Sequence, residues 1–330
     1  MSEGFRPTVV IYRADPEDPP PGSDRAQELA DLILAPDRDE LRASSAKADA
    51  LFAFRAPASH LEDSFEDAKR LRWIQSGSAG VDRVLFPKLV ASDVVVTNAR
   101  GVFDDAIAEW VIGAMLAFVT GIVTSLEDQR SSTWNDDRYT ERLAGKRLLV
   151  VGPGPIGRAA ARRARGLDVE VSAVGTRARE DKELGVVHAP EELGDELSKA
   201  DFVLDSLPLT DRTRHLFDAA AFARMKTNAR FINIGRGSTV DEPALAEALR
   251  SGRIAGAALD VFEEEPLPQT SPLWTLQNVI VSPHICGDFE GWEAAVVDLF
   301  VDNLGRWVRG EPLRNLVDKS AGYGASLTGP

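Results

Sequence analysis

The sequence predicts an α/β protein with two domains, each built on a doubly wound parallel sheet. Three observations support this fold class. The chain has 330 residues, which is more than one hydrophobic core usually organises. Short apolar runs alternate with helical stretches along most of the chain, which is the pattern of parallel strands joined by crossover helices. Near the middle, a glycine-rich turn stands between such a run and an alanine-rich helix.

The first hundred residues are predicted to form one α/β unit, within the usual size of a domain. Its strands are expected at Thr8–Tyr12, Ala50–Phe54, Leu71–Gln75 and Val94–Thr97. The polar or mixed stretches Asp24–Leu34 and Pro57–Lys69 are suited to helices or loops.

A long apolar helix is predicted to follow this unit. Ala106–Val123 is almost wholly apolar and close to the length that spans a membrane. A charge such as Glu109 near its start would be costly in lipid, and the sequence has no second stretch of this kind. We therefore expect a buried core helix rather than a membrane span.

The second α/β series is predicted to contain six strands. They are expected at Arg147–Val151, Val169–Val174, Phe202–Ser206, Arg230–Ile234, Gly256–Asp260 and Val279–Ser282. Helices are expected at Ile156–Gly166 and Glu242–Ser251, and a last one near Gly291–Gly310. Six strands with helical crossovers are what a doubly wound dinucleotide-binding sheet requires.

The glycine-rich turn lies in KRLLVVGPGPIGRAAARRA and has the spacing G-x-G-x-x-G. Gly152 permits a tight turn, Gly154 lets backbone approach a pyrophosphate, and Gly157 lets helix and strand pack closely. The helix N-terminus, with Pro155 and Ile156 in its first turn, presents free N–H groups and a positive dipole end to phosphates. Placed between a strand and a helix, the pattern predicts a dinucleotide-binding turn.

The end of the next strand bears on the choice of cofactor. NAD enzymes usually carry Asp or Glu about 20 residues beyond the first glycine, where it binds the ribose 2′-hydroxyl. Here that place holds Thr176, Arg177 and Arg179, and the first acid is Glu180. Arg and a hydroxyl bind a 2′-phosphate with charge-assisted hydrogen bonds. We therefore favour NADP(H) over NAD(H); the alternative interpretation is a solvated loop edge.

Three later segments bring reactive side chains to the carboxyl ends of predicted strands, the edge where open α/β sheets bind ligands. Arg236 lies in FINIGRGSTVDEPAL. Asp260 and Glu265 lie in GAALDVFEEEPLPQTSPLW, and His284 lies in NVIVSPHICG. Each has a structural alternative when taken singly: an Arg bonding loop carbonyls, a surface acid, or a His in a tight turn.

In this order, G-x-G-x-x-G, N-I-G-R-G, D-V-F-x-x-E-P-L-P and P-H-I-x-G closely resemble the D-2-hydroxyacid dehydrogenase family, including its glyoxylate and hydroxypyruvate reductases. The resemblance extends upstream to S-A-G-V-D at residues 78–82 and covers almost the whole chain. It implies a Rossmann cofactor domain, residues 102–288, inserted into a flavodoxin-like substrate domain, residues 1–101 and 289–330. It also implies a homodimer formed through the cofactor domain.

The same resemblance implies that His284 is the catalytic acid/base and that Glu265 is its partner. Arg236 would clamp the substrate carboxylate, and backbone N–H groups around Ala79 and Gly80 would complete the carboxylate site, with His284 also touching substrate. These residue types suit the chemistry. A developing alkoxide can be protonated by an imidazolium, and a carboxylate beside the ring favours that cation. Arg stays charged and offers a planar fork to a carboxylate.

The resemblance also implies cofactor contacts along the same edge, for which turn formation and strand capping are the alternative explanation. The residues concerned are Leu207, Pro208, Thr213, Ile234, Gly235, Arg236, Asp260, His284 and Gly287. The roles of Phe54, Arg55 and Trp134 stay open between pocket or partner contacts and simple packing. After His284 the chain reads G-D-F-E, where many relatives carry small residues and Thr, so substrate size and polarity stay open.

Composition argues against several classes of partner and compartment. The net charge of −14 disfavours nucleic acid and anionic membrane surfaces, both of which need clustered Lys and Arg. A single cysteine, Cys286, cannot form an internal disulfide, and the N-terminus lacks the pattern of a signal peptide. We therefore expect a cytoplasmic protein, and we predict no metal site.

The sequence thus predicts NAD(P)-dependent reduction of a small 2-oxo acid to the D-2-hydroxy acid. Glu265 argues against a formate dehydrogenase, which usually carries Gln there, and the short tail argues against a regulated phosphoglycerate dehydrogenase. The alternative from a different class is a nucleotide-sensing binding protein or corepressor of the same fold. Neither the particular 2-oxo acid nor the physiological direction follows from the sequence.

Overall fold

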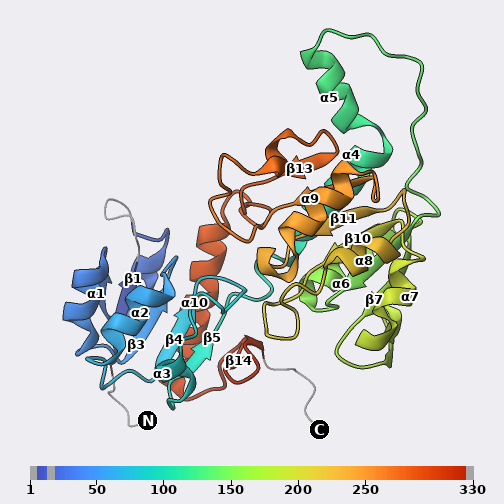
Figure 1. Ribbon diagram of the computed structural model, residues 1–330. Helices are drawn as coiled ribbons and strands as arrows, with labels where there is room; N and C mark the ends of the chain where they lie inside the picture. Colours follow the sequence, from blue (N-terminus) through green and yellow to red (C-terminus); the bar gives the residue numbers. More distant parts are fainter. Residues whose placement is uncertain (1–5, 13–18, 325–330) are drawn as a thin grey trace. The chain divides into compact units, whose positions relative to one another are not determined.

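Residues 6–12 and 19–324 are described by the computed structural model (Figure 1). The chain divides into two compact units, one formed by Met1–Phe103 with Glu290–Pro330 and the other by Asp104–Phe289. The predicted boundaries, after residues 101 and 288, lie slightly earlier than those of the structure, after residues 103 and 289. The first transition comes later because the Phe103 ring packs on Trp292 of its own unit, with ring centroids 5.8 Å apart.

The first unit contains a five-stranded parallel sheet in the order β2-β1-β3-β4-β5. This is the 2-1-3-4-5 order of flavodoxin-like sheets. Its strands are β1 (Thr8–Tyr12), β2 (Asp31–Ala35), β3 (Ala50–Ala53), β4 (Trp73–Ser76) and β5 (Val95–Thr97). Four of them are the predicted strands, with ends that differ by at most two residues.

The fifth strand, β2, was not predicted. The stretch Asp24–Leu34 was expected to be a helix or loop, but it is divided between the 3-10 helix η1 (Ser23–Glu28) and β2. This strand lies at the edge of the sheet, pairs only with β1, and buries only Ala35 fully. Its apolar run, Leu32–Ala35, follows the preceding polar stretch without a Gly or Pro between them, so the pattern did not separate a strand from a helix.

Helices cover both faces of this first sheet. They are α1 (Arg38–Ser45), α2 (Ala58–Phe65), α3 (Pro87–Val90) and α10 (Trp292–Arg309). On one face, Phe300 of α10 stacks on Phe52 and lies against Trp73, with ring centroids 4.3 and 5.9 Å apart. On the other face, Leu51 of β3 and Leu61 of α2 belong to the same buried core cluster. The C-terminal helix is therefore part of the unit formed by the first hundred residues.

The last described residues return to the edge of the same sheet. Leu316 forms an isolated antiparallel bridge with Thr97 at the end of β5. The short strands β14 (Val317–Asp318) and β15 (Tyr323–Gly324) then pair in an antiparallel hairpin.

The second unit contains an eight-stranded sheet in the order β13-β12-β11-β10-β6-β7-β9-β8. Its strands are β6 (Arg147–Val151), β7 (Glu170–Val174), β8 (Arg179–Asp181), β9 (Gly185–His188), β10 (Phe202–Asp205), β11 (Arg230–Asn233), β12 (Gly256–Leu259) and β13 (Val279–Val281). The run β9-β7-β6-β10-β11-β12 has the 3-2-1-4-5-6 order of a dinucleotide-binding sheet, with its switch point between β6 and β10. The predicted fold class, α/β with parallel sheets and a Rossmann domain, is therefore confirmed.

Two strands of this sheet, β8 and β9, are not among the six predicted ones. β8 is antiparallel to β9, whereas β9 pairs in parallel with β7. Arg179–Asp181 is wholly charged and Gly185–His188 has only two consecutive apolar residues, so neither carries an apolar run long enough to indicate a strand. The six predicted strands are present with ends that differ by at most one residue.

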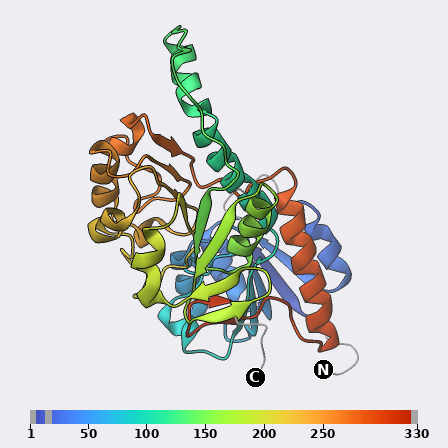
Figure 2. The same ribbon diagram turned by 90° about the vertical axis from the view of Figure 1, so that its right-hand side faces the viewer.

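Helices also cover both faces of the second sheet (Figure 2). They are α4 (Asp104–Val119), α5 (Ile122–Arg130), α6 (Pro155–Arg165), α7 (Leu193–Leu197), α8 (Ala219–Arg224) and α9 (Glu242–Arg250), with the 3-10 helices η2 (Pro190–Glu192), η3 (Gly237–Thr239) and η4 (Pro272–Thr275). On one face, α7, α8 and α9 supply Leu197, Phe222 and Leu249 to the core cluster of Val203 and Phe231. On the other face, α6 packs against α4.

The long apolar helix differs from its prediction. One helix was expected over Ala106–Val123, but α4 ends at Val119 and α5 starts at Ile122 after a bend of 66°. The bend falls at Gly121, whose φ of 72° lies in the left-handed region that favours glycine. Within the described residues no single helix meets the length and hydropathy of a membrane span, although α4 and α5 meet them as a bent pair.

Candidate active site

The glycine-rich turn joins β6 to α6 at the switch point of the second sheet. Gly152 has a φ of 95°, and a Cβ on Gly157 would lie 2.7 Å from the Gly152 carbonyl oxygen and 2.8 Å from Val150 Cγ1. In contrast, a Cβ on Gly154 would meet no atom within 4 Å, so the space around this residue is open. Each glycine therefore has the geometry that its predicted task requires.

The start of α6 is suited to a phosphate group. Gly154 is the N-cap and offers no side chain to the N–H groups of the first turn, and Pro155 stands at its start. The N–H groups of Ile156 and Gly157 are consequently directed out of the helix N-terminus without a side-chain cap. An open cradle of backbone around Gly154 and an uncapped helix end fit the pyrophosphate of a dinucleotide.

The predicted ribose site lies after β7. A Cβ on Gly175 would lie 3.1 Å from Arg179 Nη1 and 3.3 Å from Pro153 Cγ, so Arg179 reaches back to the glycine-rich turn. Thr176 and Arg177 are exposed, and the Arg177 guanidinium forms no ion pair with a described residue. The structure thus brings Arg179 close to the turn, and Arg177 lies two residues before Arg179 in the same exposed segment.

An acid that the sequence left unassigned also lies here. Arg158, which follows the last glycine of the turn, donates from Nη1 to Asp181 Oδ1 at 2.8 Å. This contact holds the pKa of Asp181 well below its usual range. Arg179 Nε lies 3.9 Å from the same carboxylate, so Arg179 is partly neutralised whereas Arg177 is not.

The loop after β10 touches the glycine-rich turn. Ser206 Oγ donates to the Gly152 carbonyl at 2.7 Å, and a Cβ on Gly152 would lie 3.2 Å from Leu207 Cδ2. Within this loop, Thr213 Oγ1 donates to the Pro208 carbonyl at 2.7 Å. The hydroxyl of Thr213 therefore shapes the loop that carries Leu207 and Pro208.

The loop after β11 lies against the loop after β10. A Cβ on Gly235 would lie 2.7 Å from the Leu207 carbonyl oxygen, and the preceding Ile234 is 6% exposed. Asn233, which is buried, accepts from the Gly235 N–H at 2.9 Å and donates from Nδ2 to the Arg236 carbonyl at 3.1 Å. Arg236 Nη1 donates to the Gly235 carbonyl at 2.7 Å. These bonds fix the backbone from which the Arg236 side chain extends.

The side chains of His284 and Glu265, predicted as an acid/base pair, lie within hydrogen-bond distance of each other. His284 Nδ1 and Glu265 Oε2 are 2.8 Å apart, and the other carboxylate oxygen accepts from the Phe262 N–H at 3.1 Å. The side chains of His284 and Glu265 are 37% and 22% exposed, so the ring is oriented on one side and accessible on the other. With Nδ1 occupied by the carboxylate, Nε2 remains to exchange a proton with a ligand.

Asp260 holds the loop that carries His284. Its carboxylate is completely buried and accepts from Ser282 Oγ at 2.6 Å and from the N–H groups of Ile285 and Cys286 at 3.0 and 3.1 Å. We predicted this residue as a cofactor contact, and in the structure its carboxylate bonds are made to this loop, directly before Gly287. Burial and the adjacent Asp260 carboxylate raise the pKa of the Cys286 thiol, which disfavours its reactive thiolate.

Ala79 and Gly80 belong to the first unit and lie in the loop after β4. Their carbonyls accept hydrogen bonds from Asn98 Nδ2 at 2.6 Å and from Ser78 Oγ at 2.7 Å. Among the described residues, none accepts a hydrogen bond from the backbone N–H of Ala79 or Gly80. These two donors are therefore available to an anion, as the predicted carboxylate site requires.

Several residues that support this edge were not singled out in the sequence. Asp205 and Asn233 are buried polar residues at the ends of β10 and β11, and Thr239 in η3 is buried between them. Asp205 and Asn233 each follow apolar residues in a predicted strand, and this pattern could have identified them. A buried polar side chain needs hydrogen-bond partners, so its presence in an apolar strand indicates a specific contact.

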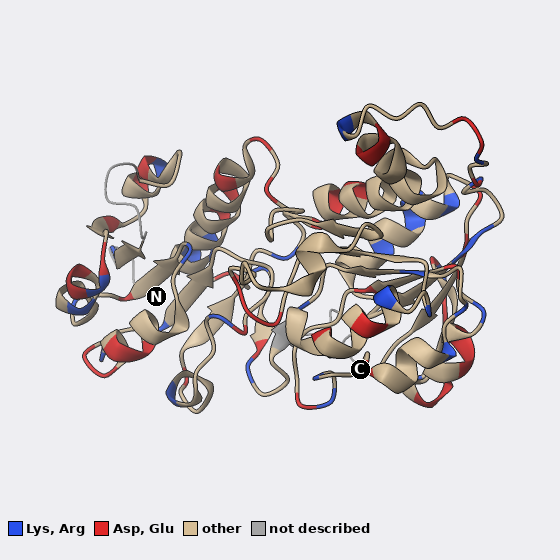
Figure 3. Ribbon diagram, turned by 45° about the horizontal axis from the view of Figure 1, so that its top comes forward, with Lys and Arg blue, Asp and Glu red and all other residues tan. Residues whose placement is uncertain are grey.

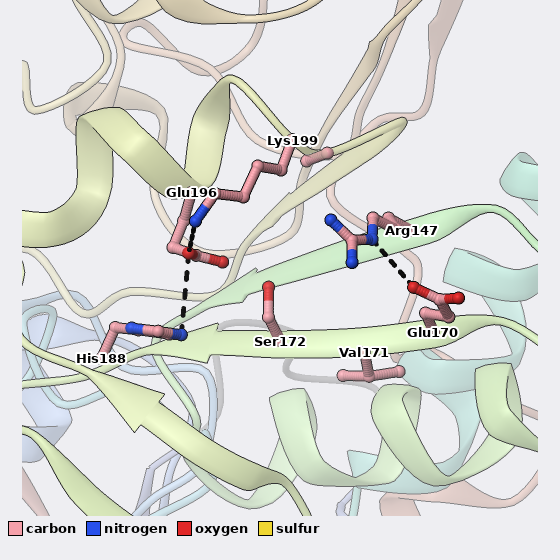
Figure 4. A pocket seen from close by; sticks show the side chains of 8 residues that line it. Arg147, Glu170, Val171, Ser172, His188, Glu196 and Lys199 are labelled. Atoms are coloured by element: carbon pink, nitrogen blue, oxygen red, sulfur yellow. Dashed lines mark hydrogen bonds and ion pairs between the residues drawn. The ribbon is translucent and has the colours of Figure 1, made fainter.

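A separate cavity of about 280 Å³ lies elsewhere on the second unit, between α7 and the strands β6, β7 and β9 (Figure 4). Its charges neutralise one another: Arg147 pairs with Glu170 at 2.8 Å and Lys199 with Glu196 at 2.7 Å. His188 Nε2 lies 3.7 Å from the Glu196 carboxylate. No cluster with the composition of a metal site occurs in residues 6–12 and 19–324.

Comparison with known proteins identifies the family. The family model for the NAD-binding domain of D-isomer-specific 2-hydroxyacid dehydrogenases matches residues 112–286. A glyoxylate reductase of Thermofilum pendens is 34% identical over 326 residues, which cover 95% of each chain. A glyoxylate/hydroxypyruvate reductase B of Citrobacter koseri is 34% identical over 322 residues, which cover 95% of this chain and 98% of the relative.

Solved structures agree with this assignment. A D-isomer-specific 2-hydroxyacid dehydrogenase of Xanthobacter autotrophicus, in complex with NADPH and MES, has a TM-score of 0.81 and 30% identity, covering 97% of this chain and 100% of that one. An NADPH-dependent glyoxylate/hydroxypyruvate reductase of Sinorhizobium meliloti, in complex with NADP and sulfate, has a TM-score of 0.82 and 28% identity with the same coverage. The chain therefore belongs to the D-isomer-specific 2-hydroxyacid dehydrogenase family of NAD(P)-dependent oxidoreductases.

Proposed function

We propose that this enzyme reduces a small 2-oxo acid to the D-2-hydroxy acid with NADP(H) as the preferred cofactor. The observation that carries the proposal is the His284–Glu265 pair, with 2.8 Å between Nδ1 and Oε2, on the same sheet edge as the glycine-rich turn and Arg236. Glyoxylate and hydroxypyruvate are the substrates we favour, because relatives named for these acids share 34% identity over 95% of this chain.

The proposed roles follow from the contacts of each side chain. The bound nicotinamide supplies hydride to the 2-oxo carbon. Arg236 binds the substrate carboxylate and polarises the carbonyl, since its guanidinium stays charged at working pH. His284 donates the Nε2 proton to the developing alkoxide, while Glu265 at Nδ1 stabilises the imidazolium from which that proton leaves. In the first unit, the N–H groups of Ala79 and Gly80 are proposed as donors to an anion.

The test is loss of reduced-nicotinamide absorbance with NADPH or NADH against glyoxylate, hydroxypyruvate, pyruvate and a branched 2-oxo acid. We expect turnover of glyoxylate or hydroxypyruvate with NADPH, and a D-configured product. If NADPH binds but none of these acids is reduced, the general 2-oxo acid reductase is ruled out and a nucleotide-sensing role takes its place.

The preference for NADP(H) has its own test in Arg177→Ala. Because Arg177 is exposed and has no described ion-pair partner, we propose that it binds the 2′-phosphate, which NADH lacks. Loss of one charge-assisted hydrogen bond should raise the KM for NADPH about ten- to one-hundredfold and leave that for NADH nearly unchanged. Arg250→Ala, on the exposed side of α9, is the matched control. Equal losses for both cofactors would remove the 2′-phosphate assignment.

We also propose a homodimer formed through the second unit. α5 extends away from the sheet of its unit (Figures 1 and 2), and no residue of α5 is buried. Ile122 and Leu126 are 49% and 48% exposed, and the Trp134 and Tyr139 side chains of the following segment are almost fully exposed. Large apolar side chains gathered in this way indicate a surface that another chain covers.

Sedimentation should therefore give twice the chain mass, and Leu126→Glu should shift the protein toward monomer. Glu127→Gln, on the same helix, is the matched control that leaves the apolar side chains intact. A wild-type monomer at micromolar concentration would contradict the proposed dimer.

Partners of other classes are not proposed. Lys and Arg are interspersed with Asp and Glu over both units (Figure 3), and the net charge is −14. Binding of a polyanion needs clustered Lys and Arg, which an acidic chain with interspersed charges disfavours. The cytoplasm remains the compartment that we propose.

A further inference from the structure

At the ends of β10 and β11, the Asp205 carboxyl group, the Thr239 hydroxyl and the Arg236 carbonyl form a buried chain of two short oxygen–oxygen contacts. If Asp205 is ionised, this chain has one hydrogen for two contacts. Thr239 Oγ1 lies 2.5 Å from Asp205 Oδ2 and 2.6 Å from the Arg236 carbonyl oxygen. Both neighbours are acceptors, but a threonine hydroxyl has a single hydrogen. Two oxygen atoms at 2.6 Å without a hydrogen between them repel each other, so a second hydrogen is needed in this chain.

The second hydrogen has one possible source among these three groups. The Arg236 carbonyl carries none, and the Thr239 hydroxyl has already been counted, so the carboxyl group of Asp205 must supply it. Asp205 Oδ2–H then donates to Thr239 Oγ1, and Thr239 Oγ1–H donates to the Arg236 carbonyl. The other oxygen, Asp205 Oδ1, accepts from the Leu207 N–H at 3.0 Å in either state.

The surroundings of Asp205 favour the uncharged form. The residue is completely buried, and its strand neighbours are Val151 on β6 and Asn233 on β11. Its other contacts, Thr239 in η3 and the Leu207 backbone, are also uncharged. Burial raises the pKa of Asp205 to about 7.

Two ionisable groups lie on the same sheet edge. The Arg236 guanidinium donates to the Gly235 carbonyl at 2.7 Å. The Asp260 carboxylate, at the end of β12, accepts from Ser282 and from the backbone of Ile285 and Cys286. Burial is the main cause that raises the pKa of Asp205, and the hydrogen bonds from Thr239 and Leu207 oppose it in part.

We propose that protonated Asp205 is a positioning residue for Arg236, acting through Thr239 on the Arg236 carbonyl. Asp205 also holds the Leu207 N–H, so one carboxyl group joins the loop after β10 to the loop that carries the substrate-binding arginine. This inference rests on the proposed role of Arg236 and adds a requirement for a proton at Asp205. When Asp205 ionises, Thr239 turns its hydrogen toward the carboxylate. The Arg236 carbonyl then keeps only its longer hydrogen bonds, from Asn233 Nδ2 and from the Thr239 N–H, each at 3.1 Å.

Kinetics against pH test the functional part. Asp205→Asn is the matched variant, because a carboxamide is always uncharged and donates to Thr239 at every pH. We expect the ratio of the wild-type KM for glyoxylate to that of Asp205→Asn to rise about three- to tenfold as pH rises from about 6 to about 8, with a smaller change in the ratio of their kcat values. Any contribution of His284 to the pH dependence is common to both proteins and cancels in these ratios. Equal pH dependence of KM in both proteins would overturn the proposal.

Thr239 provides the second pair of variants. Thr239→Ser keeps the hydroxyl and should retain the wild-type KM, whereas Thr239→Val removes both hydrogen bonds and should raise KM about three- to tenfold. Equal behaviour of the two variants would contradict the role of the hydroxyl.

Protein stability tests the protonation without any substrate, so it separates this inference from failure of the proposed function. The folded-state pKa of Asp205 lies above its unfolded value of 3.8, so its contribution to stability is present below that value and is lost as pH rises to about 7. The unfolding midpoint of Asp205→Asn minus that of the wild type should therefore increase between about pH 4 and pH 7 and then level off. A difference that does not change with pH would show that Asp205 is ionised in the folded protein.

Discussion

Replacing His284 by Ala is expected to lower kcat on the order of a hundred- to ten-thousandfold, the range that a positioned general acid contributes. Alanine has no proton to donate in place of the Nε2 proton of His284. A water molecule in the vacated space would not be positioned by Glu265 as the imidazole ring is. Binding of NADPH, followed by quenching of protein fluorescence, should remain close to the wild-type value. Glu265→Gln should show a smaller loss of kcat, since the ring persists but its cationic form loses the carboxylate at 2.8 Å.

The matched control for this variant is His188→Ala. His188 lies in the same unit and also pairs with a carboxylate, Glu192, at 2.9 Å between Nδ1 and Oε1, but it belongs to β9 rather than to the proposed site. The His188→Ala variant should therefore keep most of the wild-type activity. Wild-type turnover by His284→Ala would remove the acid/base assignment, whereas equal losses in both variants would point to a general effect of deleting a His–Glu pair.

The second large effect is expected for Gly237→Ala. A Cβ at this position would lie 1.8 Å from the Phe262 carbonyl carbon, 1.9 Å from its oxygen and 2.3 Å from the Glu263 nitrogen. All three are backbone atoms, which cannot turn away as a flexible side chain can. The segment that leads to Glu265 must therefore shift, and overpacking of this kind costs about 1–3 kcal/mol, occasionally more.

The expected result for Gly237→Ala is a lower unfolding midpoint together with a loss of kcat/KM beyond that of a merely destabilised protein. The displacement separates Glu265 from His284 and disturbs Arg236, which precedes the glycine. Gly113→Ala is the matched control, because a Cβ there meets no atom within 4 Å and lies within α4. In a helix interior this substitution is expected to stabilise by about 0.5–1 kcal/mol. Normal activity of Gly237→Ala at a temperature where it is folded would contradict the close packing of these two loops.

The sequence by itself determined the fold class, the strands buried on both faces, and the order of the functional loops. Apolar runs such as Leu148–Val151 and Phe202–Leu204 predict strands because burial on both faces demands apolar side chains. The spacing of Gly152, Gly154 and Gly157 predicts a tight turn between strand and helix from local sequence alone. His284 and Glu265 were paired by resemblance to a family, and the structure places their side chains in contact.

The tertiary structure decided what depends on neighbours distant in the chain. β8 is wholly charged, and the apolar run of β2 continues directly from a polar stretch, so only pairing with a neighbouring strand defines these two edge strands. The break at Gly121 divides a stretch whose composition suits one continuous helix.

The residues that position the proposed site could not be predicted either, because their partners are also distant in the chain. Gly237 is constrained by Phe262, and Asp205 by Thr239, which lies 34 residues further along the chain. A local pattern records which face of a strand or helix is buried, whereas the partner of a buried polar group or of a glycine is set by three-dimensional packing. The sequence therefore indicated which residues to propose as reactive, and the fold alone defined the contacts that hold them.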